Sequence, residues 1–141
     1  MKYSLGLFAI ALCMFSAGYR RSSSFREPIQ KVVQSGASQL NVSNVTNFAW
    51  EDVFVFGPYT PKKEECQTLK HSESQCSYEG LRDVDEGEFL MVFLHNASVI
   101  RIESLPRTVA DFDDRCLNRD FKRDAAVFFV EKRTTMYLTC R

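Results

Sequence analysis

Three residues, Cys66, His71 and Cys76, have types and spacing that could bind a metal ion. The pattern Cys-x4-His-x4-Cys matches the last three ligands of a zinc knuckle. A structural zinc site has four ligands, however, and no Cys precedes Cys66 by two or three residues. The pattern therefore favours oxidation of the cysteines over metal binding, and we expect no metal and no cofactor.

Two acidic clusters could also do chemistry: one contains Asp83 and Asp85, and the other contains Asp111 and Asp113. The first is not a calcium loop, because Leu94 stands where the closing Glu is required. A carboxylate from each cluster could form the acid–base pair of a small hydrolase. Alternatively, both clusters could be solvated loops that contact a basic partner.

Other catalytic patterns are missing from the sequence. It has only two histidines, His71 and His95, and the cysteines that could act as nucleophiles are expected to be paired. There is no Gly-x-Ser-x-Gly elbow, phosphate-binding loop or dinucleotide fingerprint. These absences favour a protein that is not an enzyme, although they leave the acidic-pair hydrolase open.

The elements that position these residues are best organised around residues 50–60, WEDVFVFGPYT. Residues 50–56 are aromatic and β-branched, which predicts a strand that Gly57-Pro58 ends. Thr60 is a suitable N-cap and Pro61 a suitable first residue for a helix over 61–70. Trp50 and Tyr59 are candidate binding residues, but packing at this strand-to-helix joint is favoured over direct binding, because large aromatic side chains are usually buried.

The remainder of the sequence predicts strands at 88–95, 98–105, 125–131 and 135–140. The first two form a hairpin around Asn96-Ala97, and the last two form another around residues 132–134. Residues 71–85 are expected to be a loop, and 108–118 irregular or a short helical turn. The expected fold is a single α+β domain over residues 39–141: a curved antiparallel sheet of about five strands with one helix packed on it.

The N-terminus predicts export. Residues 1–18 combine Lys2, an apolar run and the small residues Ser16 and Gly18, which is typical of a secretory signal peptide cleaved after Gly18. The run is shorter than the roughly 20 residues needed to span a bilayer, so cleavage is favoured over a membrane anchor. Residues 19–38 are expected to be a flexible leader, and the mature protein to be secreted or periplasmic.

Four cysteines follow the signal peptide: Cys66, Cys76, Cys116 and Cys140. An even number in an exported protein predicts two disulfides. Three pairings are possible, and we favour Cys66–Cys76 and Cys116–Cys140.

The charge balance argues against one class of partner. The chain has 18 basic and 18 acidic side chains and no basic stripe, so nucleic acid is not expected to bind. Sequons begin at Asn41, Asn44 and Asn96, and would accept glycans only in a eukaryotic secretory pathway. The sequence does not decide whether they do.

The stretch from Trp50 to Thr60 resembles a motif in small exported bacterial proteins, often lipoproteins, in which a Trp-acidic pair leads an apolar strand into Pro-Tyr-Thr and a helix. The resemblance covers roughly residues 40–131 and implies one domain in an exported bacterial protein. It implies no catalytic residue, because that family has no assigned activity. This chain differs in having four mature cysteines and no Cys positioned for lipidation.

The sequence therefore predicts an exported, disulfide-stabilised protein-binding module, such as an inhibitor or immunity protein in the bacterial envelope. Its partner would be another protein, bound through the two acidic clusters. The alternatives are the acidic-pair hydrolase, a structural envelope protein and, if the sequons carry glycans, a eukaryotic secreted domain. Neither the partner nor the oligomeric state follows from the sequence.

Overall fold

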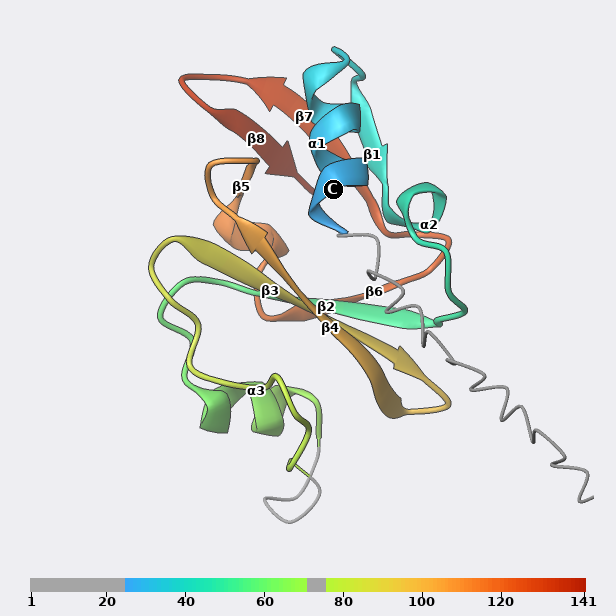
Figure 1. Cartoon of the computed structure of the whole chain (residues 1–141), viewed down its shortest axis with the longest axis vertical. Helices are drawn as coiled ribbons and strands as arrows, with labels where there is room; N and C mark the ends of the chain where they lie inside the picture. The colour runs from blue at the N-terminus through green and yellow to red at the C-terminus, as the bar shows by residue number, and fades with distance from the viewer. Residues whose placement is uncertain (1–24, 71–75) are drawn as a thin grey trace, which may run out of the picture.

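The structure is a computed structural model, and it describes residues 25–70 and 76–141. Its α+β architecture consists of two four-stranded sheets and a few short helices (Figure 1). In chain order the elements are α1 (Arg26–Gln34), β1 (Gln39–Asn41), α2 (Val42–Val45), β2 (Asp52–Phe56), α3 (Lys62–Thr68), β3 (Glu88–His95), β4 (Ser98–Pro106), β5 (Asp111–Phe112), a 3-10 turn (Asp114–Cys116), β6 (Arg119–Lys122), β7 (Val127–Lys132) and β8 (Met136–Thr139).

The strands divide between two sheets, with strand orders β1-β7-β8-β5 and β4-β3-β2-β6. All neighbours are antiparallel except β5 and β8, which are parallel. The α+β class is confirmed, but the expectation of one sheet with one helix is wrong. The three strands that the sequence did not predict, β1, β5 and β6, are two to four residues long. They are too short to show a clear hydrophobic period.

Strand β3 is an interior strand of the second sheet. Its sequence EFLMVFLH is apolar on both faces because both faces of the strand are covered. Phe89, Met91 and Phe93 belong to the main core cluster. The alternating residues Leu90, Val92 and Leu94 belong to a second cluster. Successive side chains of a strand point to opposite faces, so this one strand supplies two cores.

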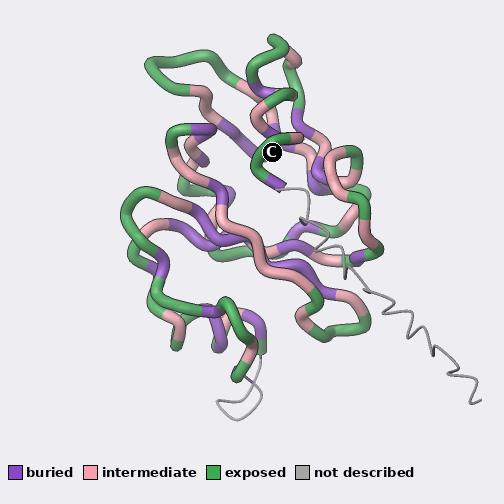
Figure 2. Tube along the Cα trace, viewed as in Figure 1, coloured by how far each residue is buried: buried purple, intermediate pink, exposed green. Residues whose placement is uncertain are grey.

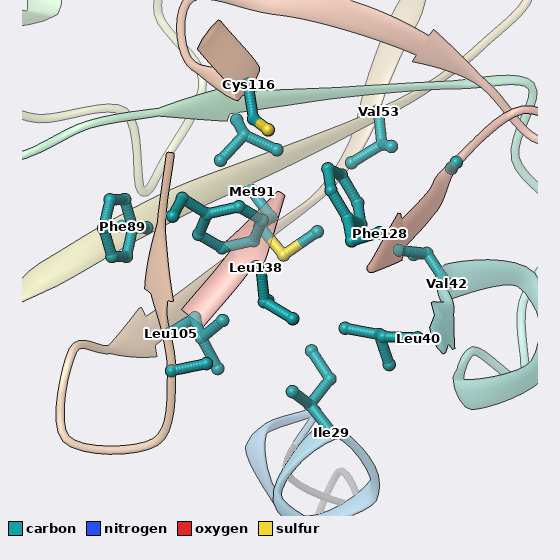
Figure 3. Packing of buried hydrophobic residues seen from close by; sticks show 14 of the residues in the cluster. Ile29, Leu40, Val42, Val53, Phe89, Met91, Leu105, Cys116, Phe128 and Leu138 are labelled. Atoms are coloured by element: carbon teal, nitrogen blue, oxygen red, sulfur yellow. The ribbon is translucent and has the colours of Figure 1, made fainter. Parts of the chain in front are cut away.

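The main core lies between the two sheets and α1, and buried residues follow the strands through it (Figure 2). Figure 3 shows Ile29 from α1 directed toward Leu40 and Leu138 of the first sheet, with Met91 of β3 beyond them. Phe112, Phe121 and Phe128 add edge-to-face ring contacts at centroid distances of 5.0–5.1 Å. Edge-to-face pairs of this kind stabilise packing beyond the area that they bury.

The expected flexible leader is ordered over Arg26–Gln34, where the structure has α1. Ile29 and Val33 lie four residues apart and are 0 % and 1 % exposed, so the helix anchors one face in the main core. Phe25, just before α1, is also buried. The segment is mostly polar, so its composition did not predict that these two apolar residues would be buried. The proposed signal peptide, residues 1–18, lies outside the described residues, as does His71.

Helix α3 packs on the opposite side of the second sheet from α1 (Figure 1), over the second core cluster. The predicted strand-to-helix joint is present, but Thr60 is not the N-cap. Pro61 occupies that position without a side-chain cap, and the helix begins at Lys62. Thr60 is instead buried and pairs its backbone with Val84.

Two disulfides tie the fold together with the favoured pairing, Cys66–Cys76 and Cys116–Cys140, each with a Cα–Cα distance of 5.7 Å. The first connects α3 to the segment before β3. The second connects the 3-10 turn to the residue after β8. In the described part of the chain, no helix combines the length and the apolar character needed to cross a membrane.

Candidate functional site

Tyr59 is the most exposed large hydrophobic side chain in the described structure, at 70 %. It lies in a β-turn closed by a hydrogen bond from the Thr60 amide to the Gly57 carbonyl, and its φ is +64°. Gly or Asn usually occupies a turn position with positive φ, because a side chain with a Cβ is strained there. The turn thus holds an aromatic ring in solvent at a cost in backbone strain.

Charged groups surround Tyr59. Partial desolvation raises the pKa of its hydroxyl; hydrogen bonding to Glu86 and the charge of that carboxylate raise it further, while Arg107 opposes them. The Arg107 guanidinium donates to the Asp111 carboxylate (2.8 Å) and to the Glu86 carbonyl (3.4 Å). We call Tyr59, Glu86, Arg107 and Asp111 the Tyr59 surface. It joins the turn before α3, the loop before β3, the residue after β4 and the first residue of β5.

The fold therefore brings three predicted site residues into one region: Tyr59, Asp85 and Asp111. Asp85 is exposed in the same loop as Glu86 and lies 3.8 Å from Arg82. Arg107 connects this loop to Asp111, because its backbone amide also donates to the Gly87 carbonyl (2.9 Å). Glu86 of the first acidic cluster and Asp111 of the second thus both contact Arg107, whereas Asp85 lies against Arg82.

Asp83 has a structural role. One of its carboxylate oxygens accepts a hydrogen bond from the Lys62 amide at 2.9 Å, which supplies the helix cap that Thr60 does not. We expect Asp83→Ala to lower the free energy of unfolding by about 1 kcal/mol, the usual value of a lost cap. The matched control Asp85→Ala should change it by less than about 0.5 kcal/mol, because Asp85 is exposed and its ion pair is long. Urea titration followed by circular dichroism would measure both, and equal losses would contradict the capping role.

Asp113 is separate from the Tyr59 surface in its contacts. It caps the 3-10 turn by accepting from the Arg115 amide (3.0 Å) and also binds the Arg115 side chain (2.7 Å). These hydrogen bonds hold its pKa below the usual value. Its carboxylate is therefore held by local contacts.

Trp50 is 2 % exposed, which supports a packing role over direct binding. Its indole donates to the Thr46 hydroxyl at 2.9 Å, and its ring meets Phe93 edge-to-face. The Arg123 guanidinium covers the ring at 5.0 Å. A shallow cleft of about 500 Å³ is lined by Thr46, Asn47, Phe48, Ala49, Trp50, His95 and Arg123.

The three sequon asparagines differ in their surroundings. Asn44 and Asn96 are exposed, and Asn96 lies in the β3–β4 turn with a positive φ. Asn41 is half-buried, and its side chain caps α2 by accepting from the Ser43 amide. A glycan would therefore fit the surface at Asn44 and Asn96 better than at Asn41.

Sequence reasoning missed Glu65, whose side chain is fully buried. Neither carboxylate oxygen has a hydrogen-bond partner among the described residues. Desolvation raises its pKa from 4.5 to about 7, with Arg82 opposing and Asp83 adding to the shift. The sequence spacing between Glu65 and Leu69 could have indicated this burial. The two residues are four apart, so their side chains share one helix face, and Leu69 is buried. With no exposure, Glu65 cannot contact a substrate in this conformation.

Within residues 25–70 and 76–141, no group of three or more His, Cys, Asp or Glu side chains is arranged to hold a metal ion. Comparisons with protein-family models, with curated proteins and with solved structures found no match to this chain. The resemblance to small exported bacterial proteins accordingly stays a prediction.

Proposed function

We propose that this chain is an exported, disulfide-stabilised protein that binds another protein through the Tyr59 surface. An inhibitor or immunity protein of the bacterial envelope would fit this description. It would be related to the small exported bacterial proteins that the chain resembles. The observation that carries the proposal is the side chain of Tyr59, which is 70 % exposed on a backbone with φ of +64°.

Strain at this position needs an explanation, because a Gly or Asn would form the same turn more easily. Unusual backbone conformations cluster at functional sites, where surrounding structure maintains them. Here the Tyr59 amide donates to the Val84 carbonyl at 2.9 Å, and the Val84 amide donates to the Thr60 carbonyl at 2.9 Å. These two bonds hold the turn against the loop before β3 and keep the ring in place.

An exposed tyrosine with a charged periphery resembles the centre and rim of a protein interface. Tyrosine is enriched among the residues that dominate binding energy, because it buries a large area with few rotatable bonds. Asp85, Glu86 and Asp111 outnumber Arg82 and Arg107 in this region, which favours a partner with a basic patch. Charge complementarity of this kind mainly accelerates association.

The two disulfides support export, because such bonds persist in oxidising compartments. A secreted or periplasmic location, after removal of residues 1–18, is part of the proposal.

The alternatives have less support. The four carboxylates proposed for a hydrolase, Asp83, Asp85, Asp111 and Asp113, each already contact an arginine or a backbone amide. Arg107 also lies between the two clusters and would oppose the raised pKa that a general acid needs. A structural envelope protein without a specific partner would not explain the strained display of Tyr59.

The test distinguishes the contribution of the Tyr59 ring to binding from the contribution of the turn conformation. Tyr59→Asn removes the aromatic side chain but keeps a residue that tolerates positive φ. We expect this variant to lose about 2 kcal/mol of partner binding, roughly a thirtyfold weakening, as for an interface hot spot. Its free energy of unfolding should stay equal or rise, because strain is relieved.

The measurement is capture of envelope and culture proteins by the immobilised, oxidised chain, quantified by mass spectrometry and then by titration of the captured partner. Ile100→Ala is the matched control, since Ile100 is also an exposed large apolar residue, at 45 %. A partner that binds wild type and Ile100→Ala alike but releases Tyr59→Asn supports the proposal. Equal capture by all three would contradict it, and charge reversal at Asp85 and Asp111 without effect would remove the electrostatic part.

A further inference from the structure

The buried carboxylate of Glu65 lies one helical turn beyond the Tyr59–Thr60 joint, in α3. Buried carboxylates in proteins are nearly always hydrogen-bonded or paired, and an exception indicates a special role. In the part of the chain that the structure describes, both oxygens of Glu65 are without a partner, and the side chain is 0 % exposed. The protein keeps this group at a cost in stability, although an apolar residue would fit the inner face of α3.

Within residues 25–70 and 76–141, three charged groups act on Glu65. Lys62 lies on its own helix, and Arg82 and Asp83 lie on the segment that leads to β3. On the face of the sheet below α3, Phe56 and Leu90 belong to the second core cluster. Glu88, two residues before Leu90 in β3, lies on the same face and is paired with Arg82. If Glu65 loses its proton, Arg82 is the cation that can compensate the charge among the described residues outside α3.

Arg82 already has other partners. It forms an ion pair with Glu88 and a longer one with Asp85, and it donates to the Asp83 carbonyl at 3.2 Å. Glu88 is only 14 % exposed, so loss of Arg82 would leave a second poorly solvated carboxylate. An ionised Glu65 must therefore either leave the core or take Arg82 from Glu88.

Both outcomes change the same segment, which also supports the Tyr59 surface. Asp83 caps α3 through the Lys62 amide, and Val84 makes the two backbone hydrogen bonds to Tyr59 and Thr60. Glu86, two residues further on, belongs to the Tyr59 surface itself. A change at Arg82 or α3 is thus transmitted through neighbouring backbone to the exposed ring.

We propose that Glu65 is a proton-operated switch for the Tyr59 surface. With its proton, α3 and residues 82–86 are docked as described. Without it, α3 separates from that segment, Tyr59 loses its backbone support and partner binding weakens. The effect on partner binding rests on the proposed function, whereas the structural change does not require a partner.

The direction of the pH effect follows from linkage. Burial raises the pKa of Glu65 to about 7 from an ordinary value of 4.5, so the folded state holds the proton more tightly than the unfolded state. The stability that protonated Glu65 provides is complete below about pH 4.5 and is lost as pH rises through about 7. The docked state is therefore the acidic one.

Hydrogen exchange of the whole, oxidised chain at pH 5.5 and pH 8 would test the switch. The reporters are the amides of Tyr59, Lys62 and Val84, whose bonds join α3 and its turn to the loop. Protection is corrected for the intrinsic effect of pH on exchange. We expect protection of these amides to fall by on the order of tenfold or more at pH 8, while amides of β3 change little.

Variants at two adjacent positions isolate the cause. Glu65→Gln keeps the shape without the charge, and Glu65→Met is apolar; both should abolish the fall in protection. Glu64→Gln removes a charge from an exposed neighbour in the same helix and should retain it. A fall that persists in Glu65→Gln and Glu65→Met would overturn the proposal, as would constant protection in the wild type.

Failure of the switch and failure of the proposed function are distinguishable in these data. The exchange experiment needs no partner, so its result stands whether or not Tyr59→Asn affects capture. If a partner is captured, wild type should bind it more weakly at pH 8 than at pH 5.5. Glu65→Gln should bind it equally at both, and a pH dependence shared by the two proteins would contradict the coupling.

Discussion

Phe93→Ala is expected to lower the free energy of unfolding by about 3–5 kcal/mol, the usual cost of truncating a buried aromatic side chain. Phe93 is fully buried at the centre of an aromatic group. Its ring meets those of Phe25, Phe48 and Trp50 edge-to-face, with centroids 5.1–5.4 Å apart. Truncation would leave a cavity between α1, the segment before β2 and the second sheet. Equilibrium urea unfolding followed by far-ultraviolet circular dichroism would measure the loss.

Phe54→Ala is the matched control for Phe93→Ala. Phe54 is half-buried on the other face of the second sheet and stacks on Phe56 at 6.0 Å. We expect this substitution to cost about 1–2 kcal/mol, because less surface returns to water. Equal costs for the two variants would contradict the assignment of Phe93 to the main core and Phe54 to the periphery of the second core cluster.

Removal of the Cys116–Cys140 disulfide by alanine at both positions should lower the free energy of unfolding by about 3–4 kcal/mol. The bond closes a 24-residue separation, and releasing it increases the entropy of the unfolded chain. Cys116 is also fully buried in the main core, so the substitution removes packing as well. Far-ultraviolet circular dichroism during urea titration would show the loss as a lower midpoint.

The other disulfide provides the control. Alanine at Cys66 and Cys76 opens a separation of only 10 residues and frees α3 from the segment before β3. Because α3 covers the smaller core cluster, we expect local loss of protection in α3 and a smaller decrease in global stability. If both double variants lost the same global stability and α3 kept its protection, this division of roles would be wrong.

Local sequence patterns predicted a large part of the fold. The apolar run at Glu88–His95 indicated a strand covered on both faces, and β3 has these bounds. The hairpin partner β4 and the later strands β7 and β8 agree within two residues. Period-two alternation is a property of consecutive residues, so it is visible without knowledge of the contacts.

The candidate site was predictable only in part. Tyr59 was identified from composition, but its φ of +64° depends on the turn that Gly57 and Thr60 close. The contacts of Asp83 and Asp111 join residues of different elements, and the sequence does not reveal how far apart their carboxylates lie. The burial of Glu65 was not predicted, because it depends on which segments pack around α3.

The sequence by itself determined the pattern of apolar positions, the strand-to-helix joint and the even set of four cysteines that follow residue 18. Each of these depends on neighbours in the chain or on residue counts. The tertiary structure decided how the strands divide between two sheets, which cysteines pair, and that α1 belongs to the main core. It also decided that Glu65 is buried and that Tyr59 is exposed among charges. These features depend on contacts between distant segments, whose pairing is set by the packing of the whole chain and leaves no local period in the sequence.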